Sequence, residues 1–535
     1  MQQITKIAFA YLLLVIGATH LGSSNVAEAQ STTIHNDSFW YTQDKQPIYS
    51  QGGGIFNFMD PISGIKKYYW YGVHYLEAER YRNDPSTLYN QCTFESVTCY
   101  SSSDLVNWTF EGDVLTKDET NKSGKTWVGR LGVAYIKEIN QYVLIVQHGN
   151  QVLFALSDSP TGRFTWHQKI NMQPMIGTSN TGDQTVFTDE DSGKSYLIYS
   201  YGRGRNKIYV SEIGMKDGKV GLLDCTQVFV GQSREGNCMF KYRNKYYMVA
   251  SNIYGWDASH AYYLVSDDIR GPFLPTNDMQ VMRGASEDYA HVSQTGFFFN
   301  VKGSVQETVV FCGDRWSDFA GNGLGYNQWC PLSFEGSTPY FNSLSSWNLD
   351  VKTGLWTVAQ TNNFVKNGSF EADRKYIPSP VKPVQTQLTG WYTEVMEGNQ
   401  VGLDSLTSPV LNYYNSPLDR KLVVGEKSLN ISDKNPFKRK VYQTIASSPY
   451  VKLSDGKYTL TAKVKNSKGF KNLEIYAISN GKKFNYQIKG EHSTWQTFRI
   501  PSIAVFGGTI EIGFIAEGNP NANCQVDDVS LVKFD

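Results

Sequence analysis

Two segments of the sequence place a carboxylate where a β-strand is expected to begin. Residues 232–237 read Gln-Ser-Arg-Glu-Gly-Asn and contain Glu235, and residues 182–187 read Gly-Asp-Gln-Thr-Val-Phe and contain Asp183. Carboxyl groups with aromatic side chains nearby suit the cleavage of a glycosidic bond, in which one carboxylic acid protonates the leaving oxygen while a second group activates water. Taken alone, a carboxylate at either position is more often a surface salt-bridge or turn residue.

The residue before Glu235 bears on its protonation. Arg234 is a permanent cation, and a cation beside a carboxylate favours the ionised form. A general acid at Glu235 therefore requires burial, or a second carboxylate, to raise its pKa. Other common catalytic motifs are missing, since the sequence has no G-x-S-x-G, no H-E-x-x-H and no Walker loop.

Two charged, glycine-containing segments are interpreted as turns. Residues 202–205 read Gly-Arg-Gly-Arg and predict a hairpin turn. Residues 189–193 read Asp-Glu-Asp-Ser-Gly and resemble a calcium loop only faintly, because the ligand spacing is wrong. We therefore predict no catalytic metal and no cofactor.

The composition fits strands and a neutral ligand. The chain has 50 Lys and Arg residues against 50 Asp and Glu, and 14% of its 535 residues are aromatic while 19% are charged. A neutral protein lacks the basic field that attracts phosphate, which argues against nucleic-acid and anionic-membrane partners. Many aromatic residues and 47 glycines suit strands joined by tight turns, and surfaces on which a flat molecule stacks.

The first 29 residues predict an export signal. Lys6 is followed by an apolar run over 7–17 and by Ala-Glu-Ala at 27–29, which is a small-x-small cleavage site. The alternative is a membrane anchor, but the run is short for a bilayer span. We expect cleavage after residue 29, no membrane insertion afterwards, and a periplasmic or extracellular protein.

The cysteines do not form a disulfide framework. Seven are present, an odd and sparse number, and none has zinc-site spacing. Cys92 with Cys99, or Cys312 with Cys330, could pair in an oxidising compartment, and isolated buried thiols are an equally good interpretation.

The region from residue 39 to 358 reads as short strands between turns. Tyr-rich segments such as 68–72, 142–146 and 195–199 follow polar turns, and the unit returns about every 50 to 70 residues, near the length of one four-stranded propeller blade. No amphipathic helix of three turns is evident. The prediction is an all-β fold, with a five-bladed β-propeller over residues 30–360.

The pattern of apolar and polar residues changes after about residue 360. Apolar and polar residues alternate cleanly in 458–464 and in 510–514. Burial of one face of each strand is typical of a sandwich of antiparallel sheets. The prediction is a second domain, a β-sandwich over residues 361–535.

Motifs over residues 51–334 resemble glycoside hydrolase family 43, and most closely its branch of exo-β-1,3-galactanase-like enzymes. They are 51–55 (Gln-Gly-Gly-Gly-Ile), 69–72 (Tyr-Trp-Tyr-Gly), 101–108 (Ser-Ser-Ser-Asp-Leu-Val-Asn-Trp), 183–196, 233–235 (Ser-Arg-Glu), 254–257 (Tyr-Gly-Trp-Asp), 293–295 (Ser-Gln-Thr) and 313–316 (Gly-Asp-Arg-Trp). The resemblance implies a five-bladed propeller with the sugar site at the narrow end of its central channel.

The resemblance also implies three catalytic roles. Glu235 matches the general acid, and Asp183 matches the carboxylate that raises the pKa of the acid and orients it. The usual base, an Asp in the first blade, is absent, as it is in the galactanase-like branch. Gln294 stands where members of that branch carry a Gln thought to hold the attacking water, although an amide is a poor base.

The sequence departs from the branch at two positions. Val73 follows Tyr-Trp-Tyr-Gly, and Gly129 stands in the segment Val-Gly-Arg-Leu, where the branch has Glu in both places. Both missing carboxylates are expected to contact the sugar. Glu77 or Glu79, in an apparent insertion, are candidates to replace them.

Further residues are predicted to contact the sugar. Indole rings stack well on the apolar face of a pyranose, whereas Trp70 and Trp108 read as blade core. The predicted contacts are Gln51, Trp127, Arg130, Trp256, Asp257, Arg315 and Trp316.

The second region resembles the jelly-roll carbohydrate-binding modules of families 4 and 9. The segments that carry this resemblance are 364–371, 390–391, 425–429 and 526–531. Asp527 and Asp528 are candidates for a structural calcium, with a turn at a strand end as the alternative. Whether the module binds sugar or only supports the propeller stays open.

The leading hypothesis is an exported, exo-acting hydrolase that cleaves galactose-containing plant glycans, the β-1,3-galactan part of arabinogalactan, with inversion. Its partner would be an oligo- or polysaccharide. One alternative is a non-catalytic glycan-binding propeller, suggested by Val73 and Gly129. Another is a hydrolase of the same fold that acts on arabinofuranosides or xylosides.

Overall fold

The computed structural model describes residues 32–89, 91–255, 257–275, 278–285, 288, 293–316, 327–372, 388–399, 410–412 and 415–534. The predicted signal segment, residues 1–29, and Trp256 lie outside these residues. Residues 32–535 form one compact unit. None of the helices in the described ranges is long and apolar enough to cross a membrane.

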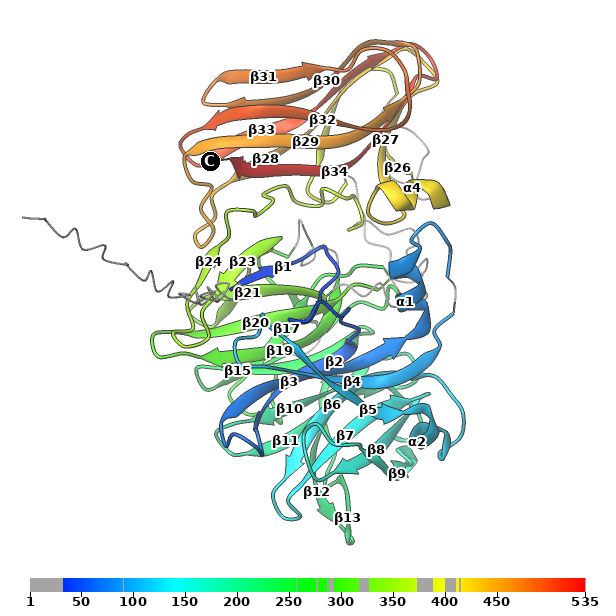
Figure 1. The fold of residues 1–535 in the computed structure, drawn as a ribbon, viewed down its shortest axis with the longest axis vertical. Coiled ribbons are helices and arrows are strands. Elements are labelled where there is room, and N and C mark those ends of the chain that lie inside the picture. The colour runs from blue at the N-terminus through cyan, green and yellow to red at the C-terminus, as the bar shows by residue number, and fades with distance from the viewer. Residues whose placement is uncertain are drawn as a thin grey trace, which may run out of the picture. The chain divides into compact units, whose positions relative to one another are not determined.

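The described chain is all-β, as predicted, and its first part consists of consecutive antiparallel sheets (Figure 1). The first sheet holds β2 (Gln51–Met59), β3 (Lys66–Tyr75), β4 (Phe94–Ser102) and β5 (Thr109–Thr116). The second holds β6 (Val128–Ile136), β7 (Gln141–His148), β8 (Gln151–Ser157) and β9 (Thr165–Ile170). The third holds β10 (Thr181–Asp189), β11 (Lys194–Tyr201), β12 (Lys207–Lys216), β13 (Lys219–Leu222) and β14 (Thr226–Val230).

Two more sheets follow in the same pattern. The fourth holds β15 (Glu235–Tyr242), β16 (Lys245–Ser251), β17 (Tyr262–Ser266) and β18 (Gln280–Val281). The fifth holds β19 (Gln294–Lys302), β20 (Glu307–Asp314), β21 (Asn327–Glu335) and β22 (Thr338–Phe341). In each of the five, successive strands pair as neighbours, apart from β14, which returns to β12.

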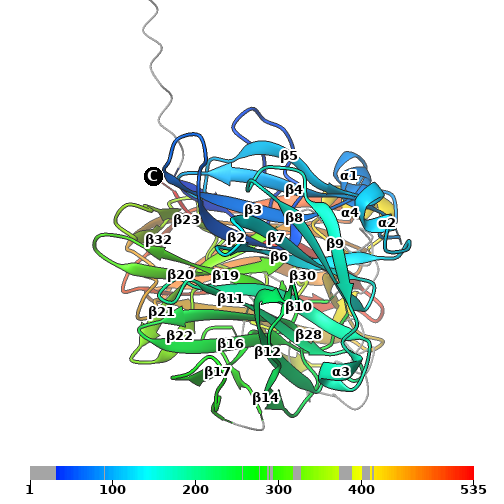
Figure 2. The same ribbon diagram turned by 90° about the horizontal axis from the view of Figure 1, so that it is seen from below.

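The first strands of the five sheets form a closed ring. β2 contacts β6, β6 contacts β10, β10 contacts β15, β15 contacts β19, and β19 returns to β2. In Figure 2, β2, β6, β10 and β19 lie near the middle, and the later strands β5, β9, β14 and β22 lie toward the rim. Side chains at the starts of these five strands therefore converge.

A three-stranded sheet joins the two ends of this region. β1 (Thr33–His35) pairs with β23 (Ser346–Leu349), which pairs with β24 (Trp356–Val358). Trp70 and Trp108 are fully buried in the cluster beside it, which confirms their interpretation as core. Burying a large apolar side chain contributes about 1.5–3 kcal/mol, so this tryptophan-rich cluster stabilises the closure.

Helices are short in the described chain. They are α1 (Leu76–Asn83), α2 (Lys117–Asn121), α3 (Gln173–Ile176) and α4 (Pro417–Leu422). None reaches three turns, as the sequence indicated. All seven cysteines lie in the described residues and none is in a disulfide, so neither suggested disulfide is formed.

The C-terminal part consists of two five-stranded sheets. One has the order β25 (Tyr392–Glu397), β28 (Phe437–Ala446), β33 (Thr509–Gly518), β30 (Phe470–Ser479) and β31 (Lys482–Gln487). The other has the order β26 (Val410–Asn412), β27 (Ser428–Ser432), β34 (Asn523–Phe534), β29 (Gly456–Asn466) and β32 (His492–Val505).

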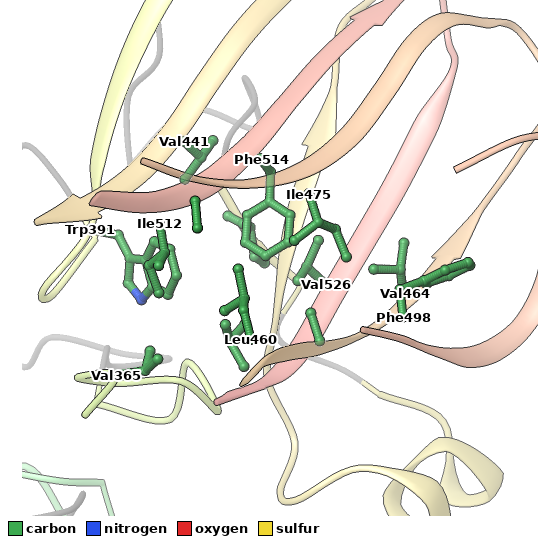
Figure 3. Close-up of a cluster of buried hydrophobic side chains, with 14 of the residues drawn as sticks. Val365, Trp391, Val441, Leu460, Val464, Ile475, Phe498, Ile512, Phe514 and Val526 are labelled. Atoms are coloured by element: carbon green, nitrogen blue, oxygen red, sulfur yellow. The ribbon is translucent and has the colours of Figure 1, made fainter. Parts of the chain in front are cut away.

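The apolar side chains of both C-terminal sheets form one core. Figure 3 shows Val441 and Phe514 of the first sheet facing Leu460 and Val526 of the second. The period-two alternation along these strands puts one face of each sheet into this core and leaves the other face polar.

Candidate active site

Each of the five ring strands begins with a register shift, and each shift contains a glycine. The shifts fall at Gln51/Gly54, Val128/Leu131, Thr181/Gln184, Glu235/Cys238 and Thr295/Phe297. β-Bulges re-aim side chains and are common next to active sites. These bulges lie in, or directly beside, the positions of all the predicted catalytic residues.

Gly236 explains why one bulge requires glycine. Its φ is +62°, and a Cβ there would lie 2.4 Å from the carbonyl oxygen of Thr295 on the neighbouring ring strand. Glycine therefore lets β15 approach β19 closely, which brings Glu235 next to Gln294.

Glu235 is a buried carboxyl group with two donors. Its side chain is 11% exposed; Oε1 accepts a hydrogen bond from Nε2 of Gln294 at 2.7 Å, and Oε2 accepts one from Nη1 of Arg205 at 2.7 Å. Burial, followed by the charge of Asp183, raises the pKa of Glu235 to about 8, although Arg205 and Arg130 oppose the shift. This shift favours the protonated form of Glu235 at neutral pH.

Asp183 lies in the same cluster and is held ionised. Its Oδ2 accepts from Nε of Arg130 at 3.1 Å and from the backbone N–H of Gly236 at 2.9 Å, and its Oδ1 accepts from Arg205 at 3.2 Å. Burial acts to raise the pKa of Asp183, but Arg205 and Arg130 outweigh it, and the pKa is lowered. Two neighbouring carboxyl groups thus have opposite protonation states.

Arg130 links the members of the cluster. The guanidinium is buried, and besides Asp183 it donates to Oδ2 of Asp314 at 2.9 Å, to Oε1 of Gln294 at 2.7 Å and to the carbonyl of Thr295 at 3.1 Å. Contact of Arg130 with sugar stays a prediction, and these four contacts within the chain show that it also holds two carboxylates and Gln294 together.

Asp314 and Arg205 are site residues that the sequence did not single out. Asp314 ends β20 and accepts from the backbone N–H of Gly52 at 2.9 Å, and burial, despite Arg130, raises its pKa. Arg205 lies in the turn between β11 and β12, which was interpreted only as a hairpin turn. The glycine near the start of each ring strand was the sequence feature that could have indicated where the members of this cluster lie.

Arg234 does not contact Glu235, contrary to what its place in the sequence suggests. It is buried, donates to Asn252 and, at 3.2 Å, to Asp278, and its guanidinium lies 4.1 Å from the ring centre of Tyr262. Adjacent side chains of an extended chain point to opposite sides, so the cation beside Glu235 comes from Arg205 instead.

Gln51 and Trp316 lie at the first ring strand. Gln51 donates through Nε2 to the carbonyl of Arg315 at 3.4 Å. The ring of Trp316 is only 5% exposed and lies 5.8 Å from the guanidinium carbon of Arg130. An indole so deeply buried offers little surface for sugar stacking, and contact of Trp316 with sugar stays a prediction.

Trp127 occupies the space at Gly129. A Cβ on Gly129 would lie 2.1 Å from Cη2 of Trp127, and Nε1 of Trp127 donates to Sγ of Cys92 at 3.3 Å. The indole is half-buried, so part of it stays accessible. Val73 is the other position at which the galactanase-like branch has Glu, and it is buried in an apolar cluster. An apolar side chain therefore occupies the space at both positions expected to carry a carboxylate.

The two candidate replacements have other partners. Glu77, in α1, is buried, and its carboxylate accepts from the backbone N–H of Thr93 at 2.7 Å and from its hydroxyl at 2.8 Å. Glu79 lies 3.5 Å from His74. These contacts anchor the segment around α1 and give no support to a role in binding sugar.

Asp257 and Arg315 contact the C-terminal part of the chain. Nζ of Lys427 donates to Oδ1 of Asp257 at 2.9 Å, and Nη2 of Arg315 donates to Oε2 of Glu371 at 3.1 Å. Both were predicted to contact sugar, and the side chain of Arg315 is almost fully buried by this pairing.

The calcium candidates have competing partners. Oδ2 of Asp528 accepts from Nζ of Lys463 at 2.8 Å, and Oδ2 of Asp527 accepts from Asn415 at 3.4 Å. A calcium ion would have to displace the Lys463 ammonium, so these residues fit the ion poorly. The described residues contain no group of three His, Cys, Asp or Glu side chains placed to hold a metal.

A cavity of about 480 Å³ lies at the far ends of the ring strands. It is lined by residues such as Phe58, Asp189, Lys241 and Lys302, and by none of the predicted site residues. Two of its cations are already paired, because Lys241 lies 3.0 Å from Asp189 and Lys302 lies 3.0 Å from Glu190. The predicted catalytic residues lie at the opposite ends of these strands.

A carboxyl group with a raised pKa beside one with a lowered pKa is the pairing that a glycosidase, an enzyme that hydrolyses glycosidic bonds, uses to protonate the leaving oxygen. Residues 76–314 match the model of the family described as "Glycosyl hydrolases family 43", so this part of the chain is similar to that family. The match contains Glu235, Asp183 and Gln294.

Solved structures of the same fold are exo-β-1,3-galactanases. One, from Phanerochaete chrysosporium and crystallised with β-1,3-galactotriose, is 19% identical with a TM-score of 0.52, and the alignment covers 94% of this chain and 100% of the other. Another, from Clostridium thermocellum, is 19% identical with a TM-score of 0.51 and the same coverage. No curated protein matches the chain.

Proposed function

We propose that the protein is an exported, exo-acting and inverting glycoside hydrolase of galactose-containing plant glycans, acting on the β-1,3-galactan part of arabinogalactan. The galactanase names of the structural neighbours support the substrate. We further propose that residues 30–360 are a five-bladed propeller and residues 361–535 a jelly-roll sandwich, with residues 1–29 as the signal that directs export to the periplasm or outside the cell.

The protonation of Glu235 carries this proposal. With a pKa of about 8, Glu235 holds a proton at neutral pH and can give it to the glycosidic oxygen as the bond breaks. Asp183 keeps its charge, maintains the raised pKa of Glu235 and orients it through the Gly236 amide and Arg205. Glu235 is the general acid, and Asp183 is its positioning partner.

Gln294 is the proposed holder of the attacking water. Inverting glycosidases keep the acid and the water-activating group about 6.5–9.5 Å apart, to leave room for water on the far face of the sugar. Gln294 now touches Glu235 at 2.7 Å, which leaves no such room. The role therefore requires that sugar binding separate the two side chains.

Replacement of the acid is the direct test. Glu235→Gln should reduce sugar release from β-1,3-galactan by about 10²–10⁴-fold, the contribution of a positioned general acid, while keeping binding measurable by calorimetry. Glu190→Gln, in the exposed turn after β10, is the matched control and should leave turnover unchanged. Unchanged turnover in Glu235→Gln would contradict the assignment of Glu235 as the general acid.

The apolar side chains at the two positions expected to carry a carboxylate favour a second candidate function, glycan binding without cleavage. Trp127 lies over Gly129, and Val73 is buried among apolar side chains, so the site lacks two expected sugar contacts. A propeller of this kind could bind glycans without cleaving them. Assays on galactans, arabinogalactans, arabinans and xylans distinguish the candidates: binding without any product favours this one, and release from arabinan or xylan alone favours the arabinofuranoside or xyloside hydrolase.

Sugar binding by the C-terminal domain stays a prediction. The outer face of the sheet around β28 carries tyrosines, but Nζ of Lys440 lies 4.2 Å from the ring centre of Tyr442, and Tyr476 is buried. Tyr392, opposite Tyr442 on the neighbouring strand, is 49% exposed, so both alternatives for this domain stay open.

A further inference from the structure

Four charged side chains join the site region to the C-terminal domain. Arg315 and Asp257 come from the site region, and Glu371 and Lys427 come from the C-terminal domain. The side chains of Arg315, Glu371 and Lys427 are 6%, 3% and 4% exposed, and that of Asp257 is 24% exposed. The pair of Arg315 with Glu371 is therefore removed from water almost completely, whereas Asp257 in the other pair keeps some exposure.

Glu371 is the centre of this charged cluster. Its Oε1 accepts from the backbone N–H groups of Glu426 at 2.9 Å and of Lys427 at 2.6 Å, while its Oε2 accepts from Arg315. Its backbone carbonyl also accepts from Nζ of Lys427 at 3.3 Å, and that ammonium reaches Asp257. One carboxylate and one ammonium thus hold two separate segments of the site region.

Buried ion pairs are weak evidence for stability. Desolvation of the charges offsets much of their attraction, while loss of one partner leaves a costly buried charge. Their best-attested benefit is to specify one arrangement of the groups that carry them. Here the arrangement that they specify is that of Arg315 and Asp257.

Arg315 is connected to the catalytic cluster through its own backbone and its neighbour. Its carbonyl accepts from Gln51 at 3.4 Å, and the preceding residue, Asp314, holds both the Gly52 amide and the guanidinium of Arg130. Arg130 in turn holds Asp183 and Gln294. A continuous chain of contacts therefore runs from Glu371 to the catalytic residues.

We propose that Glu371 and Lys427 are positioning residues for the active site, and that the C-terminal domain is thereby a working part of the enzyme. This inference rests on the proposed function. Glu371 fixes the segment at Arg315 and Lys427 fixes the segment at Asp257, so the site stays assembled before sugar arrives.

The kinetic test uses Glu371→Gln and Lys427→Met in the full chain. Each substitution should leave only a fraction of the molecules with the segments at Arg315 and Asp257 held in place. The apparent affinity for substrate falls by that fraction, so KM should rise about five-fold or more with little change in kcat. Irreversible loss of folded enzyme would instead lower the apparent kcat at constant KM, and an unchanged KM in both variants would count against the proposal. Lys463→Met, which breaks the pair with Asp528 inside the C-terminal domain, is the matched control and should change neither value.

Hydrogen exchange gives a readout that needs no activity. Backbone amides of residues 51–55 and 312–316 should exchange faster in Glu371→Gln than in the parent or in Lys463→Met, because local opening becomes easier. Unchanged exchange there overturns the proposal whatever the turnover is. If Glu371→Gln does not fold, Lys427→Met decides the question at residues 251–259. A parent protein without hydrolytic activity would refute the proposed function and leave this readout valid.

Discussion

The amide of Gln294 donates a hydrogen bond from Nε2 to Oε1 of Glu235 at 2.7 Å, and accepts one at Oε1 from Arg130 at 2.7 Å. These two contacts fix which end of the amide faces the acid. The N–H donor on the carboxyl group favours its ionised form and opposes the raised pKa. In the proposed reaction the glycosidic oxygen accepts the proton of Glu235. To do so it must lie against the carboxyl group, where the amide of Gln294 lies now.

Replacement of Gln294 tests whether this residue holds the attacking water or only keeps the carboxyl group of Glu235 in place. Gln294→Ala should lower kcat by about 10²-fold, the low end for a positioned acid–base group, because the nucleophile is no longer held. Sodium azide, which needs no activation, should restore part of the rate and give a glycosyl azide of inverted configuration.

The acid variant provides the comparison for this rescue. In Glu235→Gln the leaving oxygen lacks its proton donor, so azide should not restore cleavage of a poor leaving group. If azide fails to rescue Gln294→Ala as well, Gln294 holds the carboxyl group in place and does not hold the nucleophile.

The pH dependence of kcat/KM should show its basic limb near the pKa of Glu235. The acid is protonated below about 8 and loses its proton as the pH rises through that value, so activity should fall there. An unperturbed glutamic acid would lose its proton several units lower. A basic limb below pH 6 would show that Glu235 is not held protonated. The lowered pKa of Asp183 keeps that residue ionised throughout the neutral range.

Two substitutions should move this basic limb in opposite directions. The charge of Asp183 raises the pKa of Glu235 and the charge of Arg205 lowers it. Asp183→Asn should therefore shift the limb to lower pH, and Arg205→Met should shift it to higher pH, as read from profiles of kcat/KM. Arg203→Met is the matched control, because Arg203 is exposed in the same turn. Shifts of the same sign in both variants would contradict the electrostatic account.

The sequence predicted the residues that lie on regular strands better than the contacts between them. Glu235, Asp183 and Gln294 stand at strand starts, and a closed ring brings such positions together. The pairing of Glu235 with Arg205, 30 residues away, depends on how two sheets are placed, and no local pattern encodes it. Arg234 misled the sequence interpretation because adjacency along a strand separates side chains.

The sugar-contact candidates show the same limit. Arg315 pairs with a residue 56 positions away, and Asp257 with one 170 positions away, so the sequence around each gave no sign of these partners. The resemblance named the segments of Gln51, Arg130 and Asp314, and all three residues lie in or beside the cluster. It did not distinguish a residue that holds the carboxyl groups from one that would touch sugar.

The contact between Trp127 and Gly129 gives a test of why the expected carboxylate is absent. A Cβ on Gly129 would overlap the indole at 2.1 Å, so Gly129→Ala should lower the free energy of unfolding by about 1–3 kcal/mol, the usual cost of overpacking. The same change in a Trp127→Ala background should cost almost nothing, because the overlapping ring is gone. Gly221→Ala, on β13, is the control, since its nearest neighbour is the flexible side chain of Gln168 at 3.3 Å. Urea unfolding of the four-member cycle measures the coupling. A cost that persists without Trp127 would mean that the backbone, and not the indole, excludes a side chain at this position.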